Sequence, residues 1–319
     1  MRALLGLAAA LLLATGAARA EFPDRPVRML YGFAPGGSGD IAARLLADTV
    51  SPLLGQPVLV ENRTGANGMV AAEAAASSPP DGHTVLFCTT GNMTIITELP
   101  DTRLPVNPAK DLTGLAMLAR TTFGLVVAPD SPWQGINDIV AEARRRPGQI
   151  SYASPGVGSV QHLAGELLKQ KTGTDMIHVP YRGSQPALLD IVSGRIGFTI
   201  TNLGDTIGQI RKGGLRLIGL GDPLAQTFFP ETPLIARDVP GFETYAWFGL
   251  CGPRNMPEAA IGLWEGAVRR AVAEPRVRDR LMENGLVPAF EGSAALNRLM
   301  EQNRATFRAV IRAANIRAQ

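Results

Sequence analysis

The stretch MLYGFAPGGSGDIAARLLADTV, residues 29–50, joins an apolar run to a helical pattern through a loop rich in glycine. Within it, Gly37 to Ala42 fits the pattern G-x-G-x-x-A, which binds the pyrophosphate of a dinucleotide where a strand leads into a helix. Glu61 ends the next apolar run, about where a ribose-binding acid is expected. Taken alone, this stretch favours an NAD(P)-dependent oxidoreductase.

Strand-like and helix-like segments alternate along the chain. In the first part they occupy residues 27–33, 38–55, 57–62, 68–78 and 83–90. The alternation restarts at Phe123 and continues through 123–129, 136–148, 150–154, 159–173, 176–181, 184–194 and 196–202. This order is typical of sheets covered by helices, so we predict an α/β protein with two lobes, each with a mainly parallel sheet.

The first 20 residues have the composition of a signal peptide. Arg2 precedes an apolar stretch from Ala3 to Ala14, and residues 18–20 form an A-x-A cleavage pattern. The apolar stretch is shorter than the ~20 residues that a membrane-spanning helix needs. We therefore expect cleavage after residue 20 and a mature, soluble chain in the periplasm.

The charge balance bears on the kind of partner, and the two cysteines bear on a possible disulfide. Without residues 1–20 the chain keeps 29 basic and 28 acidic residues, so we expect no nucleic-acid partner. Cys88 and Cys251 each lie in an apolar, strand-like run. Export permits a disulfide between them, but two cysteines alone specify no framework, and we favour buried free thiols.

Three strand-to-helix junctions share one composition. Ser38, Ser159 and Ser184 each follow a loop that contains glycine and begin a helical pattern, so each is a natural N-cap. Helix N-termini present free N–H groups and partial positive charge, and they bind anions without lysine or arginine. The three junctions therefore predict an anion clamp formed by both lobes.

The sequence offers no catalytic or metal-binding set. The patterns HExxH, CxxC, GxSxG and GxxxxGK are all absent. A hydrolase that acts through Ser159 and His162 would lack an acid to orient the histidine. Asp40 is expected to brace the first loop rather than to act as a base. We expect no enzyme activity, no cofactor and no metal. The alternative is an exported NAD(P)-dependent oxidoreductase that uses the Gly37–Ala42 loop and Glu61.

Six stretches resemble one family, the periplasmic receptors of tripartite tricarboxylate transporters, also called Bug-type solute-binding proteins. They are FAPGGSGDIAARLLA (33–47), LGQPVLVENRTGANG (54–68), PPDGHTVLF (79–87), PGQISYASPGVGSVQHLAGELL (147–168), HVPYRGSQPALLDIVSGRI (178–196) and WFGLCGP (247–253). The resemblance covers nearly the whole mature chain.

The resemblance implies a two-lobe periplasmic binding protein of the type II, Venus-flytrap kind. Lobe 1 would comprise residues 21–122 and 246–319, and lobe 2 residues 123–245, joined by two crossovers. Such a receptor closes around a small organic carboxylate, held largely by backbone amides, hydroxyls and water. It delivers the ligand to one large and one small integral membrane subunit. We expect a monomer.

The resemblance implies that the residues at matching positions of this sequence contact the ligand. The candidates are Phe33, Ala34, Gly37, Ser38, Asp40, Thr89, Thr90, Gly91, Ser154, Gly156, Gly158, Ser159, His162, Tyr181, Arg182, Gly183, Ser184, Thr201 and Asn202.

Three departures from the family pattern affect the distal half of the site. Thr201 and Gly197 stand where aspartate is common, and Asn92-Met93 replaces a small residue and histidine. Di-, tri- and aromatic monocarboxylates all suit such a site. Because Thr201 carries no charge, we expect a plain carboxylate rather than an amino acid. The alternative is that Thr201 points into the lobe and only packs.

Overall fold

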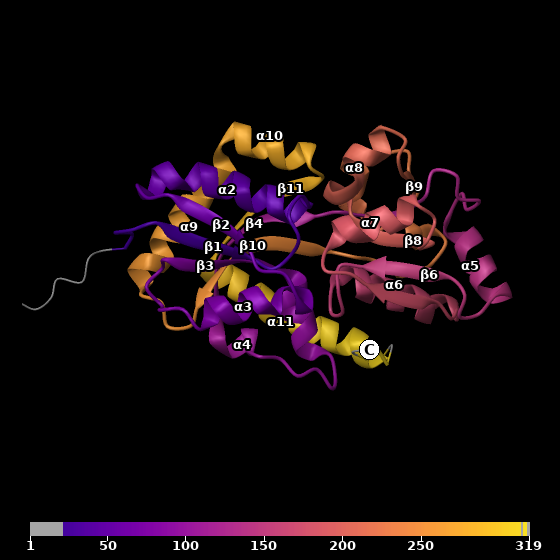
Figure 1. Cartoon of the computed structure of the whole chain (residues 1–319), viewed down its shortest axis with the longest axis horizontal. Helices are drawn as coiled ribbons and strands as arrows, with labels where there is room; N and C mark the ends of the chain where they lie inside the picture. Colours follow the sequence, from indigo (N-terminus) through magenta and orange to yellow (C-terminus); the bar gives the residue numbers. More distant parts are fainter. Residues whose placement is uncertain (1–21, 314, 318–319) are drawn as a thin grey trace, which may run out of the picture.

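The computed structural model describes residues 22–313 and 315–317, which form two sheets flanked by helices (Figure 1). The predicted signal peptide, residues 1–20, lies outside the described residues. One sheet has the strand order β11-β4-β10-β3-β1-β2 and the other the order β7-β6-β8-β5-β9. We call each sheet with its covering helices lobe 1 and lobe 2, respectively.

Lobe 1 is built from both ends of the described chain. Its strands are β1 (Val27–Tyr31), β2 (Val58–Asn62), β3 (Thr84–Thr89), β4 (Leu112–Thr121), β10 (Ala246–Pro253) and β11 (Leu286–Gly292). Its helices are α2 (Ser38–Leu54), α3 (Met69–Ala76), α4 (Pro108–Asp111), α9 (Glu258–Ala273), α10 (Pro275–Glu283) and α11 (Ser293–Ala313), with short turns η1 (Ala66–Gly68), η2 (Gly91–Ile95) and η3 (Ile96–Glu98).

Lobe 2 is built from the middle of the chain. Its strands are β5 (Phe123–Val127), β6 (Ser151–Ser154), β7 (Ile177–Pro180), β8 (Phe198–Asn202) and β9 (Arg216–Leu220). Its helices are α5 (Ile136–Arg145), α6 (Val160–Thr172), α7 (Ser184–Val192) and α8 (Leu203–Arg211), with turns η4 (Pro223–Thr227) and η5 (Ile235–Arg237).

Helix α2 shows why these segments fold as they do. Its apolar residues recur at helical spacing, and Ala43, Leu46 and Val50 are fully buried in the lobe 1 core. The helix ends at Gly55, which has the left-handed conformation that glycine adopts most easily. This packing fixes the start of α2, and the loop before it, at the edge of the sheet.

The predicted α/β architecture with two lobes is confirmed, but the strand pairing is mixed rather than mainly parallel. In lobe 1, β1 pairs parallel with β2 and β3, whereas β10 runs antiparallel between β3 and β4, and β11 antiparallel to β4. In lobe 2, β6 pairs parallel with β7 and β8, and β5 antiparallel with β8 and β9. Two of the antiparallel strands, β5 and β10, follow the points where the chain changes lobe.

Two crossovers and a helix join the lobes. The chain leaves lobe 1 at Thr122, between β4 and β5, and re-enters it at β10. Helix α11 begins against β4, and its end lies below lobe 2 near α6 (Figure 1). There Phe307 and Ile311 share a hydrophobic cluster with residues of α6, and Gln170 Nε2 donates to the carbonyl oxygen of Ala313 at 2.9 Å.

The expectation of free cysteines is wrong, because Cys88 and Cys251 form a disulfide. Cys88 lies on β3 and Cys251 on β10, and the antiparallel pairing of these strands places their Cα atoms 5.9 Å apart. Both side chains are fully buried. The disulfide therefore connects the part of lobe 1 that precedes lobe 2 to the part that follows it.

Candidate functional site

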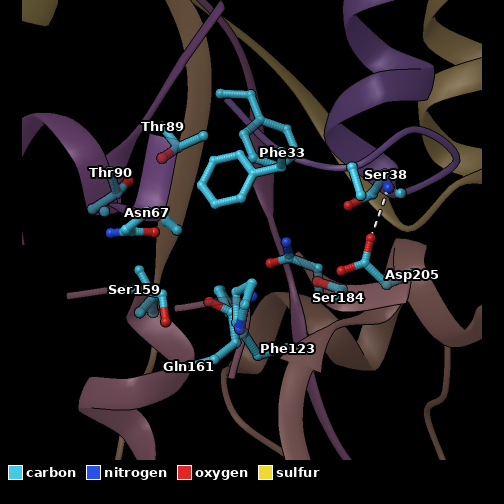
Figure 2. A pocket seen from close by; sticks show the side chains of 18 of the residues that line it. Phe33, Ser38, Asn67, Thr89, Thr90, Phe123, Ser159, Gln161, Ser184 and Asp205 are labelled. Atoms are coloured by element: carbon cyan, nitrogen blue, oxygen red, sulfur yellow. Dashed lines mark hydrogen bonds between the residues drawn. The ribbon is translucent and has the colours of Figure 1, made fainter. Parts of the chain in front are cut away.

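A cavity lies between the lobes, at the ends of β1, β3, β6 and β8 and the start of β10 (Figure 2). The space open to the centres of water-sized molecules is about 50 Å³, and one water needs ~10–15 Å³ on that measure. Its lining consists of Tyr31, Phe33, Ala34, Gly37, Ser38, Asn67, Thr89, Thr90, Gly91, Phe123, Pro155, Ser159, Val160, Gln161, Ser184, Gln185, Asn202, Asp205, Ala246, Trp247 and Phe248. No lysine or arginine occurs among these described residues.

Ten of the nineteen predicted site residues line this cavity. They are Phe33, Ala34, Gly37, Ser38, Thr89, Thr90, Gly91, Ser159, Ser184 and Asn202. The others, Asp40, Ser154, Gly156, Gly158, His162, Tyr181, Arg182, Gly183 and Thr201, do not. Their positions, described below, show what each does instead.

Three polar atoms of the lining are buried and have no hydrogen-bond partner in the described part of the chain. They are Ser38 Oγ, Asn67 Nδ2 and Asn202 Oδ1. Buried polar groups are normally paired, because desolvation without a partner costs ~1–3 kcal/mol each. The cavity is therefore prepared for a polar molecule, and the three atoms come from both lobes.

The first turns of three helices reach the cavity, although only one has the predicted cap. Ser159 caps α6, since its hydroxyl accepts the N–H of His162 at 3.1 Å. Ser38 and Ser184 are instead the first residues of α2 and α7, whose N-cap positions are taken by glycine. The predicted caps at these two positions are wrong, and the Ser38 hydroxyl stays available to a ligand.

Asp205 is a residue of the cavity that the sequence analysis missed. It lies in the first turn of α8, one helical turn beyond Thr201, and is 9% exposed. Its Oδ1 accepts the backbone N–H of Ser38 at 2.7 Å, and Thr201 Oγ1 donates to its Oδ2 at 3.5 Å. The premise of an uncharged site beside Thr201 is therefore wrong. The acidic residue in the first turn of a predicted helix was the available signal.

Asp40 braces the loop before α2, as predicted. Its carboxylate accepts the backbone N–H of Gly36 at 3.1 Å, the Nδ2 of Asn62 at 2.8 Å and the guanidinium of Arg44. Burial opposes ionisation of Asp40, but hydrogen bonds from Arg44, Asn62 and Gly36 outweigh it and lower its pKa. Asp40 fixes the loop and does not face the cavity.

The predicted glycines of lobe 2 bring the lobes together rather than line the cavity. A Cβ on Gly158 would stand 2.9 Å from the side chain of Ile96, and one on Gly183 would stand 3.2 Å from the amide nitrogen of Ala34. Both glycines have positive φ, so another residue would also be strained. These positions keep the opposing lobe within contact distance.

Tyr181 and Arg182 line a second cavity, which shares Phe33, Asn67 and Pro155 with the first. Tyr181 donates its hydroxyl to Asp190 at 2.6 Å, and the Arg182 side chain is exposed. Neither residue contributes to the lining of the first cavity. Arg182, the one predicted site residue with a positive side chain, therefore does not line the first cavity.

Ser154, His162 and His178 form a buried cluster behind the β6–α6 loop. Ser154 Oγ lies 2.6 Å from His178 Nε2, and the two imidazole rings stack with centroids 4.1 Å apart. His162 Nδ1 accepts the backbone N–H of Gly158 at 3.3 Å, so its ring is turned away from the Ser159 hydroxyl, which donates to Gly156. The Ser159–His162 pair that the hydrolase alternative needs is therefore not formed.

We expect both imidazoles to remain neutral well below pH ~6.5, the ordinary pKa of histidine. Burial, assisted by Lys169, lowers the pKa of His162 to about 4, and burial, assisted by His162, lowers that of His178 to about 3. In the unfolded chain both histidines become protonated near pH ~6.5. The stability that the neutral imidazoles contribute is therefore fully present above that pH. It is lost as the pH falls toward 4, at about 1.4 kcal/mol per unit and per histidine.

Imidazole NMR titration measures this directly. Two of the three histidines should show no midpoint above pH 5 in the folded protein. In guanidinium chloride all three should titrate near pH 6.5. Midpoints near 6.5 for His162 and His178 in the folded protein would contradict the buried, neutral cluster.

The dinucleotide interpretation does not fit the geometry. Glu61, the proposed ribose-binding acid, is held in an ion pair by Arg28 at 2.6 Å and is outside the cavity lining. Within residues 22–313 and 315–317, no cluster of three or more histidine, cysteine or acidic residues could hold a metal. Of the helices in the same part of the chain, none combines the length and apolar character that crossing a bilayer requires.

A family model described as "Tripartite tricarboxylate transporter family receptor" matches residues 42–316. The chain belongs to this family. The resemblance found in the sequence is confirmed, and the family's Bug-type name recurs in protein BugT of Bordetella pertussis. BugT is 31% identical over 270 residues, which are 84% of this chain and 83% of that protein.

Solved structures support the same assignment. An R. palustris protein with adipate is 31% identical and aligns with a TM-score of 0.89, over 93% of this chain and 99% of that one. MatC from Rhodopseudomonas palustris with bound malate is 29% identical, with a TM-score of 0.85 over 91% of this chain and 100% of that one. This tripartite tricarboxylate receptor is a solute-binding protein, not an enzyme, and the oxidoreductase alternative is wrong.

Proposed function

We propose that this receptor binds a small organic carboxylate in the cavity between its lobes and delivers it to a tripartite transporter in the membrane. The observation that carries the proposal is the lining itself. Helix N-termini and buried polar atoms without partners surround a cavity that has neither lysine nor arginine among its described residues. Such a site suits an anion held by neutral donors.

The backbone N–H groups of α6 and α7 are the main donors in this proposal. The first N–H groups of a helix have no partner within it, and the Ser159 cap takes only that of His162. The N–H groups of Val160 and Gln161, and those of Ser184 and Gln185, therefore remain to bind the carboxylate. Asn67 Nδ2 adds a donor from lobe 1.

The relatives support the chemical class of the ligand. The R. palustris structure holds adipate and MatC holds malate, and both compounds are small organic carboxylates. The proposal extends that class to this chain and does not name the compound. Delivery to one large and one small membrane subunit follows from the family's role.

Closure of the lobes completes the proposed cycle. Lobe 1, residues 21–122 and 246–319, would rotate against lobe 2, residues 123–245, at the two crossovers. Residues 1–20 would direct export and be removed, so that the mature receptor binds its ligand in the periplasm as a monomer.

A thermal-shift screen against organic acids tests the function. We expect at least one small carboxylate to stabilise the mature protein, by about 2.7 kcal/mol when its concentration is 100 times the Kd. The matched controls are the amides of the same acids, which have the same shape without the charge. If no acid shifts the transition, or if the amides shift it equally, the receptor does not bind carboxylates in this way.

A further inference from the structure

The Asp205 carboxylate occupies the N-terminus of a helix in the opposite lobe. It belongs to α8 of lobe 2, and its Oδ1 accepts the N–H of Ser38, the first residue of α2 in lobe 1, at 2.7 Å (Figure 2). Gly37 permits this close approach, because a Cβ at that position would lie only 3.3 Å from Asp205 Oδ1. One of the three helix N-termini at the cavity is thus already paired with an anion supplied by the protein.

This carboxylate also sets the charge of the cavity. Lysine and arginine are missing from the lining, as far as the chain is described, so no side-chain cation offsets Asp205. The Tyr31 hydroxyl remains a neutral donor, because burial and the neighbouring Asp205 and Asp40 raise its pKa well above 10. A ligand with two carboxylates would place a third negative charge in a space without a counter-charge, and like charges at close range are unfavourable.

Asn202 adds an acceptor to the segment that carries Asp205. Asn202 Oδ1 is buried, belongs to the same β8–α8 segment and has no hydrogen-bond partner among the described residues. Donors predominate at the start of α6, as described above. The cavity therefore has one end suited to a carboxylate and another suited to a group that donates hydrogen bonds.

We propose that Asp205 makes the receptor selective for a ligand with a single carboxylate and, at its other end, an ammonium, amide or hydroxyl group. Asp205 Oδ2 and Asn202 Oδ1 accept from that group, while the start of α6 holds the carboxylate. The inference rests on the proposed function and narrows the ligand class. It separates this receptor from its relatives that hold adipate and malate, which each have two carboxylates.

Calorimetric titration with matched compounds tests the inference. The pairs are glutarate with 5-aminopentanoate, adipate with 6-aminohexanoate, and glutarate with its monoamide. In the wild-type protein we expect the better single-carboxylate compound of the series to bind at least tenfold more tightly than the corresponding diacid. A diacid that binds more tightly than its partners would overturn the inference.

The Asp205→Asn variant gives an independent readout. Asparagine keeps an oxygen that can accept from Ser38 but removes the charge, so the preference should move toward the diacid by at least tenfold. Asp279→Asn, an exposed position on α10 outside the cavity, removes the same charge and should leave the preference unchanged. An unchanged ratio in Asp205→Asn would overturn the inference.

The two proposals fail in different ways. If neither single-carboxylate compounds nor diacids bind, the proposed function fails and this inference with it. If diacids bind best, the proposed function stands and only the selectivity assigned to Asp205 is refuted. Should Asp205→Asn not fold, the wild-type ratios alone decide between these results.

Discussion

Replacement of Cys88 and Cys251 by alanine is expected to lower the free energy of unfolding by about 4–5 kcal/mol. The disulfide closes a ring over a sequence separation of 163 residues. In the chain-entropy treatment, the restriction of the unfolded chain grows with the logarithm of ring length, and a ring of this size stands near the upper end of the range. Urea denaturation of the oxidised protein and the double variant measures the difference.

The single variants provide the control. Cys88→Ala or Cys251→Ala already removes the cross-link, so each should lose nearly as much stability as the double variant. If the two single effects were small and added up to the double effect, packing of the buried sulfur atoms would explain the loss instead. Disulfide stabilisation through the unfolded chain would then be refuted for this protein.

Replacement of Gly204 by alanine is expected to weaken ligand binding by about 10–100-fold. Gly204 lies in α8 of lobe 2, and a Cβ there would overlap the carbonyl oxygen of Asn284 in lobe 1 and stand 2.7 Å from Ser38 Cβ. Overpacking of this kind costs ~1–3 kcal/mol. Because it arises only where the lobes meet, it destabilises the closed, liganded state and weakens binding. Calorimetry should show the loss, and small-angle scattering should show a larger radius of gyration.

Gly208→Ala is the matched control on the same helix. Nothing lies within 4 Å of a Cβ built at Gly208, and the residue is exposed. Alanine should stabilise α8 by about 0.5–1 kcal/mol and leave affinity unchanged. Equal affinities in the two variants would show that α8 does not meet lobe 1 in the liganded state.

Local features of the fold could be predicted from the sequence. The apolar spacing and the glycine stop predicted a helix over 159–173, and α6 spans Val160–Thr172 with Gly173 in the left-handed conformation. Ser159 caps this helix as expected, since capping depends only on neighbouring residues. Ten of the nineteen predicted site residues also line the cavity, because the ends of strands in one sheet meet at the same edge.

Features that depend on distant pairing could not be predicted in this way. Cys88 meets Cys251 only because β10 inserts between β3 and β4, an order that no local pattern encodes. Asp205 has the sequence context of an ordinary first-turn acid, yet its carboxylate reaches Ser38 because the lobes meet there. For the same reason, glycines expected to approach a ligand approach the other lobe instead.

Helix α11 limits how the receptor can open. Phe307 and Ile311 are buried in a cluster that includes Val160 and Leu163 of α6, and exposure of each such side chain to water costs about 1.5–3 kcal/mol. A motion that lifted lobe 2 away from α11 would incur that cost in addition to breaking the contacts at the cavity. Rotation about the α6–α11 contact avoids it. We therefore expect the C-terminal helix to act as a pivot, and the cavity to open on the opposite side, where Ser38 and Asp205 would separate.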